Sequence, residues 1–102
     1  HLEGIKFMPI NEWNEPNYWL SCMTVTGKVK PLDIMLALEN ENIESRPIWK
    51  PMHMQPYYEK YDFIGSDVAE NIFENGVCLP SDTKMTDRDL ERICDIIKGL
   101  WK

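Results

Sequence analysis

The stretch from Thr86 to Trp101 constrains the fold of this chain more than any other part of the sequence. Thr86 can cap a helix, and Asp87 and Asp89 then fall in the first turn, where the helix dipole favours acidic side chains. The apolar residues that follow share one face of the predicted helix; they are Leu90, Ile93, Cys94, Ile97 and Trp101. That face has to be buried against another layer of secondary structure.

Two further helices are predicted earlier in the chain. The first begins at Pro31, because proline is favoured in the first helical turn, and it ends at Asn40 or Asn42, which tolerate the left-handed conformation. The second begins at Asp67, which has an acidic residue three positions later and resembles an N-cap pair. It ends at Gly76. Both carry apolar residues at helical spacing.

Three strands are expected between these helices. Residues 18–25 are rich in aromatic, β-branched and other apolar side chains, which predicts a largely buried strand. Residues 43–49 form the second candidate, in which Pro47 lacks an amide proton and so belongs at a sheet edge or a strand end. Residues 77–79 form the third, halted by Pro80. The order of elements predicts a small α/β sandwich, a short sheet with helices packed on it.

A chain of 102 residues fits a single domain. Residues 1–17 contain several proline and asparagine breakers and are predicted to form an irregular arm; Phe7 and Trp13 suggest that this arm packs against something. Residues 18–102 are predicted to form the domain itself. Because the sequence does not begin with methionine, we expect it to be a fragment.

Composition excludes several classes of partner. The formal net charge of −6 disfavours nucleic acid and anionic membranes, which both require a basic face. No apolar run is long enough to span a bilayer. The three cysteines, Cys22, Cys78 and Cys94, are odd in number and widely spaced, so we expect buried thiols in a reducing cytoplasm. No cysteine or histidine pair has zinc-site spacing.

The loop that follows the second strand carries most of the candidate binding residues. Two prolines bracket His53, which predicts an ordered loop with one helical turn within residues 55–61. His53 can hydrogen-bond a sugar hydroxyl or a phosphate oxygen, and Arg46 can clamp a carboxylate or a pyrophosphate. Lys50 is a weaker candidate of the same kind. Aromatic side chains here can stack on a base or a sugar ring; they are Trp49, Tyr57 and Tyr58.

Each candidate also has a purely structural alternative. His53 can instead stabilise its loop through a backbone bond, Arg46 can pair with Glu44, Lys50 can simply be solvated, and the aromatic residues can pack at a domain boundary. These alternatives remain open from the residues alone.

The pattern from Asn42 to Pro56 resembles the C-terminal signature of the DegT/DnrJ/StrS-type sugar aminotransferases. In that family a leucine-rich helix precedes a strand with an arginine, followed by an aromatic-x-Pro-x-His-x-Gln loop. The matching positions here are Leu32, Leu36, Ile43, Arg46, Trp49, Pro51, His53 and Gln55. Later family features are matched by Ala69-Glu70, Leu79-Pro80 and Asp87-Arg88-Asp89-Leu90. The resemblance extends from about Trp19 to the last residue.

The resemblance implies a fold-type-I enzyme with a large domain that binds pyridoxal phosphate (PLP) and a small C-terminal domain, usually a homodimer. Such enzymes move an amino group, commonly from glutamate, to a keto group on a nucleotide-sugar. This chain would be the small domain, shaping the substrate side of the active site through Arg46, Trp49, Lys50, His53 and Tyr57.

The catalytic machinery is expected to lie outside this chain. The lysine that forms the Schiff base belongs to the large domain in this family, and no lysine here has a comparable context. The fragment is therefore predicted to hold no PLP, to contain no catalytic residue and to be inactive alone. Related dehydratases, some of which replace that lysine with histidine, remain possible for the parent. A free-standing acidic module that binds a peptide or small ligand through residues 49–58 is the alternative.

Overall fold

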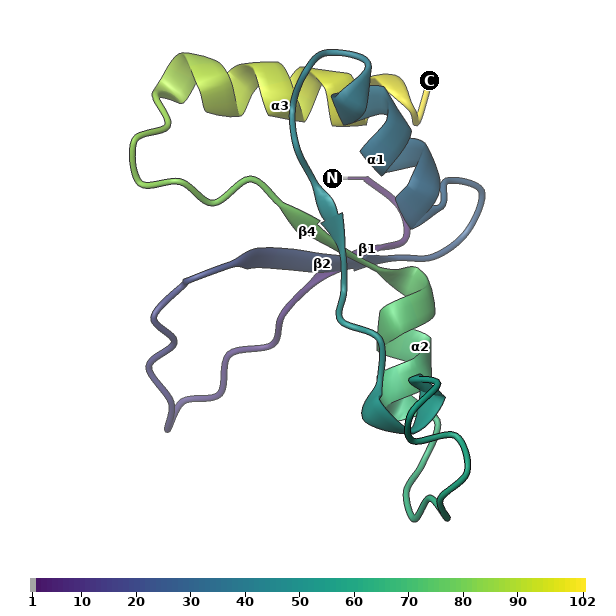
Figure 1. Ribbon diagram of the computed structural model, residues 1–102. Helices are drawn as coiled ribbons and strands as arrows, with labels where there is room; N and C mark the ends of the chain where they lie inside the picture. The colour runs from purple at the N-terminus through teal and green to yellow at the C-terminus, as the bar shows by residue number, and fades with distance from the viewer. Residues whose placement is uncertain (1) are drawn as a thin grey trace.

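The computed structural model describes residues 2–102, arranged as a four-stranded antiparallel sheet with helices on both sides (Figure 1). Helices α1 and α3 cover one face, and α2 extends from the opposite face. The elements in chain order are β1 (Ile5–Phe7), β2 (Ser21–Val25), α1 (Pro31–Glu39), β3 (Arg46–Pro47), a 3₁₀ helix (Met52–Met54), α2 (Val68–Asn75), β4 (Gly76–Leu79) and α3 (Asp87–Gly99). The predicted α/β class is confirmed.

The sheet has the strand order β1-β2-β4-β3, so its two central strands come from distant parts of the sequence. Cys22 of β2 lies opposite Cys78 of β4, and Arg46 of β3 lies on the other side of Cys78. Strand β3 is at the edge, which confirms the position predicted for Pro47, since its missing amide proton costs no ladder bond there.

The core lies between the sheet and the helices α1 and α3. Met23, Val25 and Val77 project from the central strands toward this side. They pack with apolar residues of the two helices, and the helical members of the core are Ile34, Leu38, Ile93 and Ile97. Alternation along the strands places Cys22 and Cys78 on the opposite face.

The residues predicted to end α1 and to cap the start of α3 act as expected. After α1, Asn42 adopts a left-handed conformation with φ 58°, while its amide donates to Glu39 O and the amide of Ile43 donates to Leu38 O. This is the Schellman arrangement, and Ile43 also packs against the core near Leu38. At the start of α3, the Thr86 hydroxyl accepts a bond from the Asp89 amide, as an N-cap does.

Helix α3 differs from its prediction in one respect. Ile93 and Ile97 are buried, but Cys94 is exposed and Leu90 is nearly half-exposed. Only Ile93 and Ile97 of this face belong to the core cluster, which also contains residues of α1 and of the central strands. The expectation that all three cysteines are buried is therefore wrong for Cys94.

The junction between α2 and β4 contains no loop. Gly76 ends the helix as predicted, but its φ of −97° is ordinary for any residue. The need for glycine is one of space, because a Cβ atom would collide with the Ile48 side chain and the Ile72 carbonyl oxygen. This close contact ties the segment after β3 to the end of α2.

The structure corrects the prediction that residues 1–17 are irregular throughout. Residues 5–7 form β1, because β2 offers its free edge and the Thr26 amide donates to Gly4 O at 2.9 Å. Three residues are too few for a strand pattern to be recognised in sequence.

Two predicted strands are shorter than expected. The strand predicted at 18–25 begins only at Ser21, since Tyr18 has a φ of 52° that interrupts the extended backbone. The strand predicted at 43–49 is reduced to Arg46–Pro47. Its partner β4 offers few residues, and Pro47 cannot donate to the ladder.

The helical turn expected within residues 55–61 lies earlier, at Met52–Met54. Gln55 precedes Pro56 and takes an extended ψ of 138°, as residues before proline usually do, so the helical geometry ends there. Residues 56–60 form turns rather than a helix.

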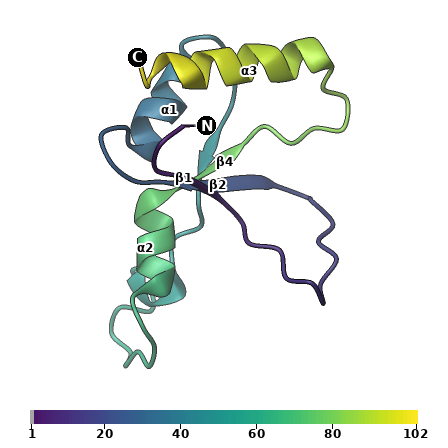
Figure 2. The same cartoon turned by 180° about the vertical axis from the view of Figure 1, so that it is seen from behind.

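Below the sheet the chain forms two separate arms, which both views display (Figures 1 and 2). The first arm consists of residues 8–20, and the second consists of residues 49–67 together with α2. The radius of gyration is 15.4 Å, against about 13 Å for a compact domain of this size. The open shape leaves the aromatic side chains of both arms largely exposed, among them Trp13, Trp19, Trp49 and Tyr57. Within residues 2–102, no helix has the length and apolar character required to cross a membrane.

Candidate functional site

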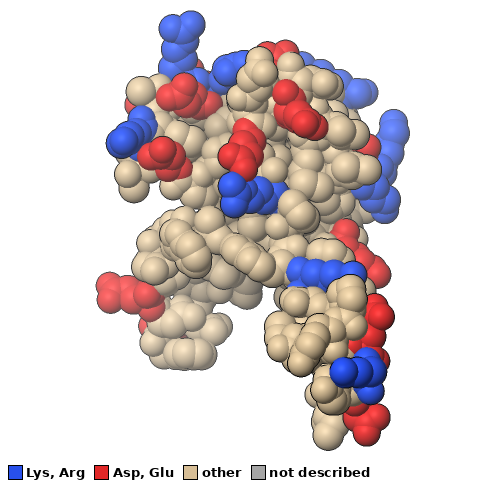
Figure 3. Space-filling view, viewed as in Figure 1, with Lys and Arg blue, Asp and Glu red and all other residues tan. Residues whose placement is uncertain are grey.

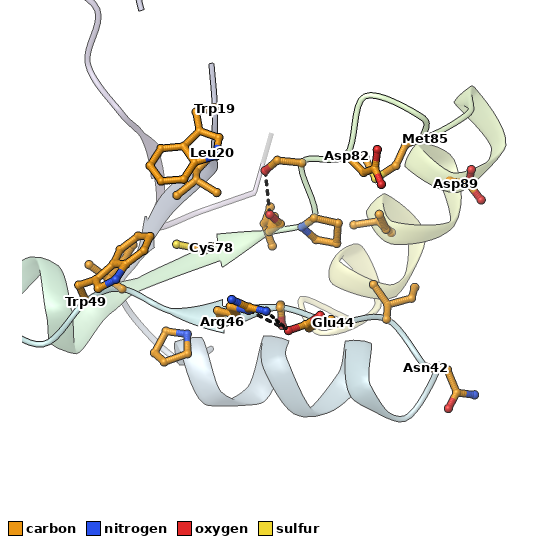
Figure 4. A pocket seen from close by; sticks show the side chains of 18 of the residues that line it. Trp19, Leu20, Asn42, Glu44, Arg46, Trp49, Cys78, Asp82, Met85 and Asp89 are labelled. Atoms are coloured by element: carbon orange, nitrogen blue, oxygen red, sulfur yellow. Dashed lines mark hydrogen bonds and ion pairs between the residues drawn. The ribbon is translucent and has the colours of Figure 1, made fainter. Parts of the chain in front are cut away.

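An open groove of about 980 Å³ runs along the edge strand β3 (Figure 4). One wall is formed by residues 42–50, and the other by the end of β4 and its connection to α3. The walls separate because β3 pairs with β4 over only two residues. Three of the five predicted binding residues line this groove, namely Arg46, Trp49 and Lys50.

Arg46 is held in the groove by its place in β3. Its guanidinium bonds the Glu44 carboxylate through Nη2 at 2.7 Å and Nε at 2.8 Å. Both side chains are about three-quarters exposed, at 74% and 73%. An exposed ion pair of this kind contributes at most about 1 kcal/mol. The pairing with Glu44 foreseen as an alternative is present, and it is weak enough for an anionic ligand to displace it.

Trp49 and Trp19 lie on the same side of the groove, one from each arm (Figure 4). Their side chains are 67% and 72% exposed, so their ring faces are available for contact. Trp19 was not identified as a site residue from the sequence. The signal available was a cluster of aromatic residues just before β2, which predicted burial in a strand instead.

Lys50 is exposed in the groove and makes no ion pair among the described residues. Its carbonyl oxygen accepts a bond from Gln55 Nε2 at 3.3 Å, so Gln55 closes the turn that contains His53. The Gln55 of the sequence motif therefore stabilises the loop backbone.

His53 lies outside the groove, in a cluster with Phe63 and Glu70. Its Nε2 is 2.8 Å from Glu70 Oε1, and its ring stacks on Phe63 with centroids 3.7 Å apart and planes inclined by 15°. This carboxylate contact differs from the backbone bond considered earlier. Asp67 occupies the N-cap position of α2 as predicted, but its side chain forms no cap bond, and Glu70 binds His53 instead.

Tyr57 also lies outside the groove, on the surface of the second arm. It is 69% exposed. It meets Tyr58 edge to face at 5.0 Å, and Lys60 Nζ lies 5.3 Å from its ring centre. The structure thus groups Arg46, Trp49 and Lys50, and it places His53 and Tyr57 elsewhere on the same arm.

A pair of thiols lies beside Arg46 on the face of the sheet between the arms. Cys22 Sγ and Cys78 Sγ are 3.4 Å apart across β2 and β4. Burial and the neighbouring Cys22 raise the pKa of Cys78 to about 11, so this thiol stays protonated at neutral pH. Sequence spacing could not reveal this pair, because it depends on the register of two strands distant in sequence.

Comparison with known protein families shows which family the chain belongs to. The profile of the DegT/DnrJ/EryC1/StrS aminotransferase family matches residues 1–98. The chain belongs to this family. EpsN of Bacillus subtilis (strain 168), named as a pyridoxal phosphate-dependent aminotransferase, is 37% identical over 99% of this chain and 27% of its own length. GDP-perosamine synthase of Vibrio cholerae is 32% identical over 83% of this chain and 24% of its own length. The chain thus spans about a quarter of the length of these relatives.

Solved structures show the same fold. A DegT DnrJ EryC1 StrS aminotransferase from Brucella abortus superposes with a TM-score of 0.81 over 96% of this chain and 26% of its own. Its sequence identity is 21%, so this likeness concerns the fold alone.

The side chains of this segment do not by themselves fit PLP, the cofactor that this family implies. Its aldehyde is held by a lysine amine in an enclosed site. Every lysine in residues 2–102 is exposed to solvent, including Lys50 in the groove. The same residues contain no cluster of three or more metal-ligating side chains.

Proposed function

We propose that this chain is the C-terminal small domain of a PLP-dependent aminotransferase that transfers an amino group from an amino acid such as glutamate to a keto nucleotide-sugar. Family membership and the names of the two relatives support this proposal. The observation that carries the role of the segment is the groove at β3, which opens beside two arms with exposed aromatic residues. Such a surface suits a small domain that packs against the large domain of the parent polypeptide and against the second subunit of a homodimer.

The residues of the groove suit a nucleotide-sugar in a particular way. The guanidinium of Arg46 presents a planar set of donors that fits a pyrophosphate, after releasing Glu44. Lys50 adds a second positive charge next to it, and Trp49 offers a ring face for a base or sugar. His53 and Tyr57 lie further along the same arm, where they would contact the sugar. PLP, held by residues outside this chain, supplies the electron sink for amino transfer.

Replacement of Arg46 in the full-length protein tests this role. For Arg46→Ala we expect the KM for the keto nucleotide-sugar to rise about tenfold or more, because a charge-assisted contact contributes about 1.5–3 kcal/mol. For His53→Ala, turnover of the sugar should fall while the absorbance band of the bound cofactor is unchanged. Steady-state kinetics and absorbance spectra provide both measurements.

Arg88→Ala is the matched control, since Arg88 is an exposed arginine of α3 that does not line the groove. Wild-type kinetics in both the Arg46 and the His53 variants would rule out the substrate-binding role of this segment. A full-length protein that binds no PLP would rule out the aminotransferase assignment itself.

A further inference from the structure

We propose that Glu70 is a positioning residue that holds the imidazole proton of His53 on Nε2 and leaves Nδ1 as a hydrogen-bond acceptor for a hydroxyl group of the sugar substrate. This inference rests on the proposed function, because it specifies which substrate group His53 contacts. It also separates two possibilities that the sequence left open, a hydroxyl and a phosphate oxygen.

The position of the proton follows from the contact with Glu70. An ionised carboxylate only accepts hydrogen bonds, so the 2.8 Å contact between Glu70 Oε1 and His53 Nε2 requires the hydrogen on Nε2. In a neutral imidazole the other nitrogen then carries a lone pair and can only accept. A carboxylate that fixes a histidine tautomer in this way is a common device in binding and catalytic sites.

The ring is prevented from turning over by its surroundings. Its stacking on Phe63 fixes the ring plane, and the side chain is only 17% exposed. Glu70 is itself anchored on the first turn of α2, and His53 lies in the 3₁₀ helix Met52–Met54. A half-turn of the ring about the Cβ–Cγ bond would put the carbon Cε1 in the place of Nε2 and so break the bond to Glu70.

Nδ1 remains available to a ligand. Among the side-chain hydrogen bonds of residues 2–102, His53 takes part only through Nε2. In the same part of the chain, the only buried side-chain nitrogen or oxygen atom without a partner is Ser45 Oγ. Nδ1 therefore reaches solvent rather than being sealed in the protein.

The chemistry of this arrangement favours a hydroxyl donor. An acceptor nitrogen pairs with an O–H group, whereas a phosphate oxygen would place two acceptors against each other. The negative charge of Glu70 behind the ring further disfavours an anion. Arg46 and Lys50 in the groove thus bind the phosphates of the substrate, and His53 binds its sugar.

Histidine nitrogen NMR of the full-length protein tests the position of the proton directly. With ¹⁵N-labelled histidine, the His53 signals are those lost in His53→Ala. We expect a protonated Nε2 and an unprotonated Nδ1 in the wild type, and a mixture of tautomers in Glu70→Gln, whose amide can either accept or donate. Glu74→Gln removes the same charge one turn later on α2 at an exposed position, and should leave the spectrum unchanged.

Kinetics test the consequence for the substrate. In Glu70→Ala we expect the KM for the keto-sugar to rise about fivefold to tenfold, as for loss of one hydrogen bond, with a smaller effect on kcat. Glu70→Gln should recover part of this loss, and the half-reaction with the amino donor should be unaffected. Either a proton on Nδ1 of wild-type His53 or Glu70 variants that match Glu74→Gln would overturn the inference. A wild-type protein with no amino-donor half-reaction would instead count against the proposed function, while the NMR result still decides the role of Glu70.

Discussion

Cys22 and Cys78 show how the environment of a residue sets its chemistry. They face each other across β2 and β4, but Cys78 is buried and Cys22 is only partly so, while Cys94 is exposed on α3. Since the thiolate is the reactive form, the raised pKa of Cys78 makes it the least reactive of the three at neutral pH.

Alkylation with iodoacetamide should follow this order. In the folded protein at pH 8 we expect Cys94 to be modified first and Cys78 last. Modification of Cys78 should accelerate only as the pH approaches about 11, where its thiol ionises. Mass spectrometry of the digested protein measures each site. Cys94→Ser should remove the fast phase, and a Cys78 that reacts as quickly as Cys94 would contradict the assigned environment.

Prediction at the residue scale succeeded where the signal was local. Asn40 or Asn42 was predicted to end α1 in the left-handed conformation, and the structure selects Asn42, with a φ of 58°. The partner of His53 could not be predicted, since Glu70 lies 17 positions away and meets it only after the arm folds back on α2. The grouping of Arg46, Trp49 and Lys50 followed from sequence proximity, whereas Trp19 joins them only through the sheet.

At the scale of elements, α3 combines a clear sequence signal with a complete capping box. Thr86 and Asp89 each bond the backbone amide of the other, at 2.8 Å for the Thr86 amide and 3.3 Å for the Asp89 amide. The hydroxyl of Thr86 also donates to the Asp89 carboxylate, and these bonds hold the pKa of Asp89 below its usual value of 3.8.

The capping box makes the stability of α3 depend on pH. Because the pKa of Asp89 is lowered by folding, its contribution is present above pH 3.8 and is lost as the pH falls through the lower folded value. Asp89→Asn should therefore be less stable than wild type at pH 7, with the difference vanishing in strong acid. Thr86→Ala should cost about 1 kcal/mol at neutral pH. Urea unfolding at several pH values measures both, with Asp95→Asn as the control on the same helix. Equal losses for Asp89→Asn and Asp95→Asn would contradict the capping role.

The short elements were the hardest to predict from sequence. Strands β1 and β3 each depend on a partner strand that is distant in the chain, and neither is long enough to show a period of its own. The helices were located well, because caps and periodicity are local properties.

At the scale of the whole molecule, charge and apolar surface are separated. Charged residues lie over α1 and α3 and along the outer side of the second arm, and the facing sides of the two arms are mostly uncharged (Figure 3). The arms instead expose aromatic side chains such as Trp19 and Trp49. This distribution is typical of a surface that is covered in a larger assembly.

The isolated segment should reveal that uncovered surface. We expect residues 1–102 alone to self-associate at micromolar concentration and to bind a hydrophobic dye, because the apolar surface of the arms stays in water. Replacing Trp19 and Trp49 together with serine should reduce both effects more than replacing Leu32 and Leu36 of α1. Analytical ultracentrifugation and dye fluorescence provide the measurements. A clean monomer that binds no dye would favour a free-standing binding module.

The bond between Trp101 Nε1 and Glu3 O, at 3.0 Å, joins residues 98 positions apart. Strand β2 likewise depends on β4, which is made more than fifty residues later. A ribosome releases β2 long before β4 exists, so Met23 and Val25 lack their core contact with Val77 of β4 until then. The sheet can therefore close only once β4 has been made, and a nascent chain stopped before β4 should remain open to proteases and chaperones.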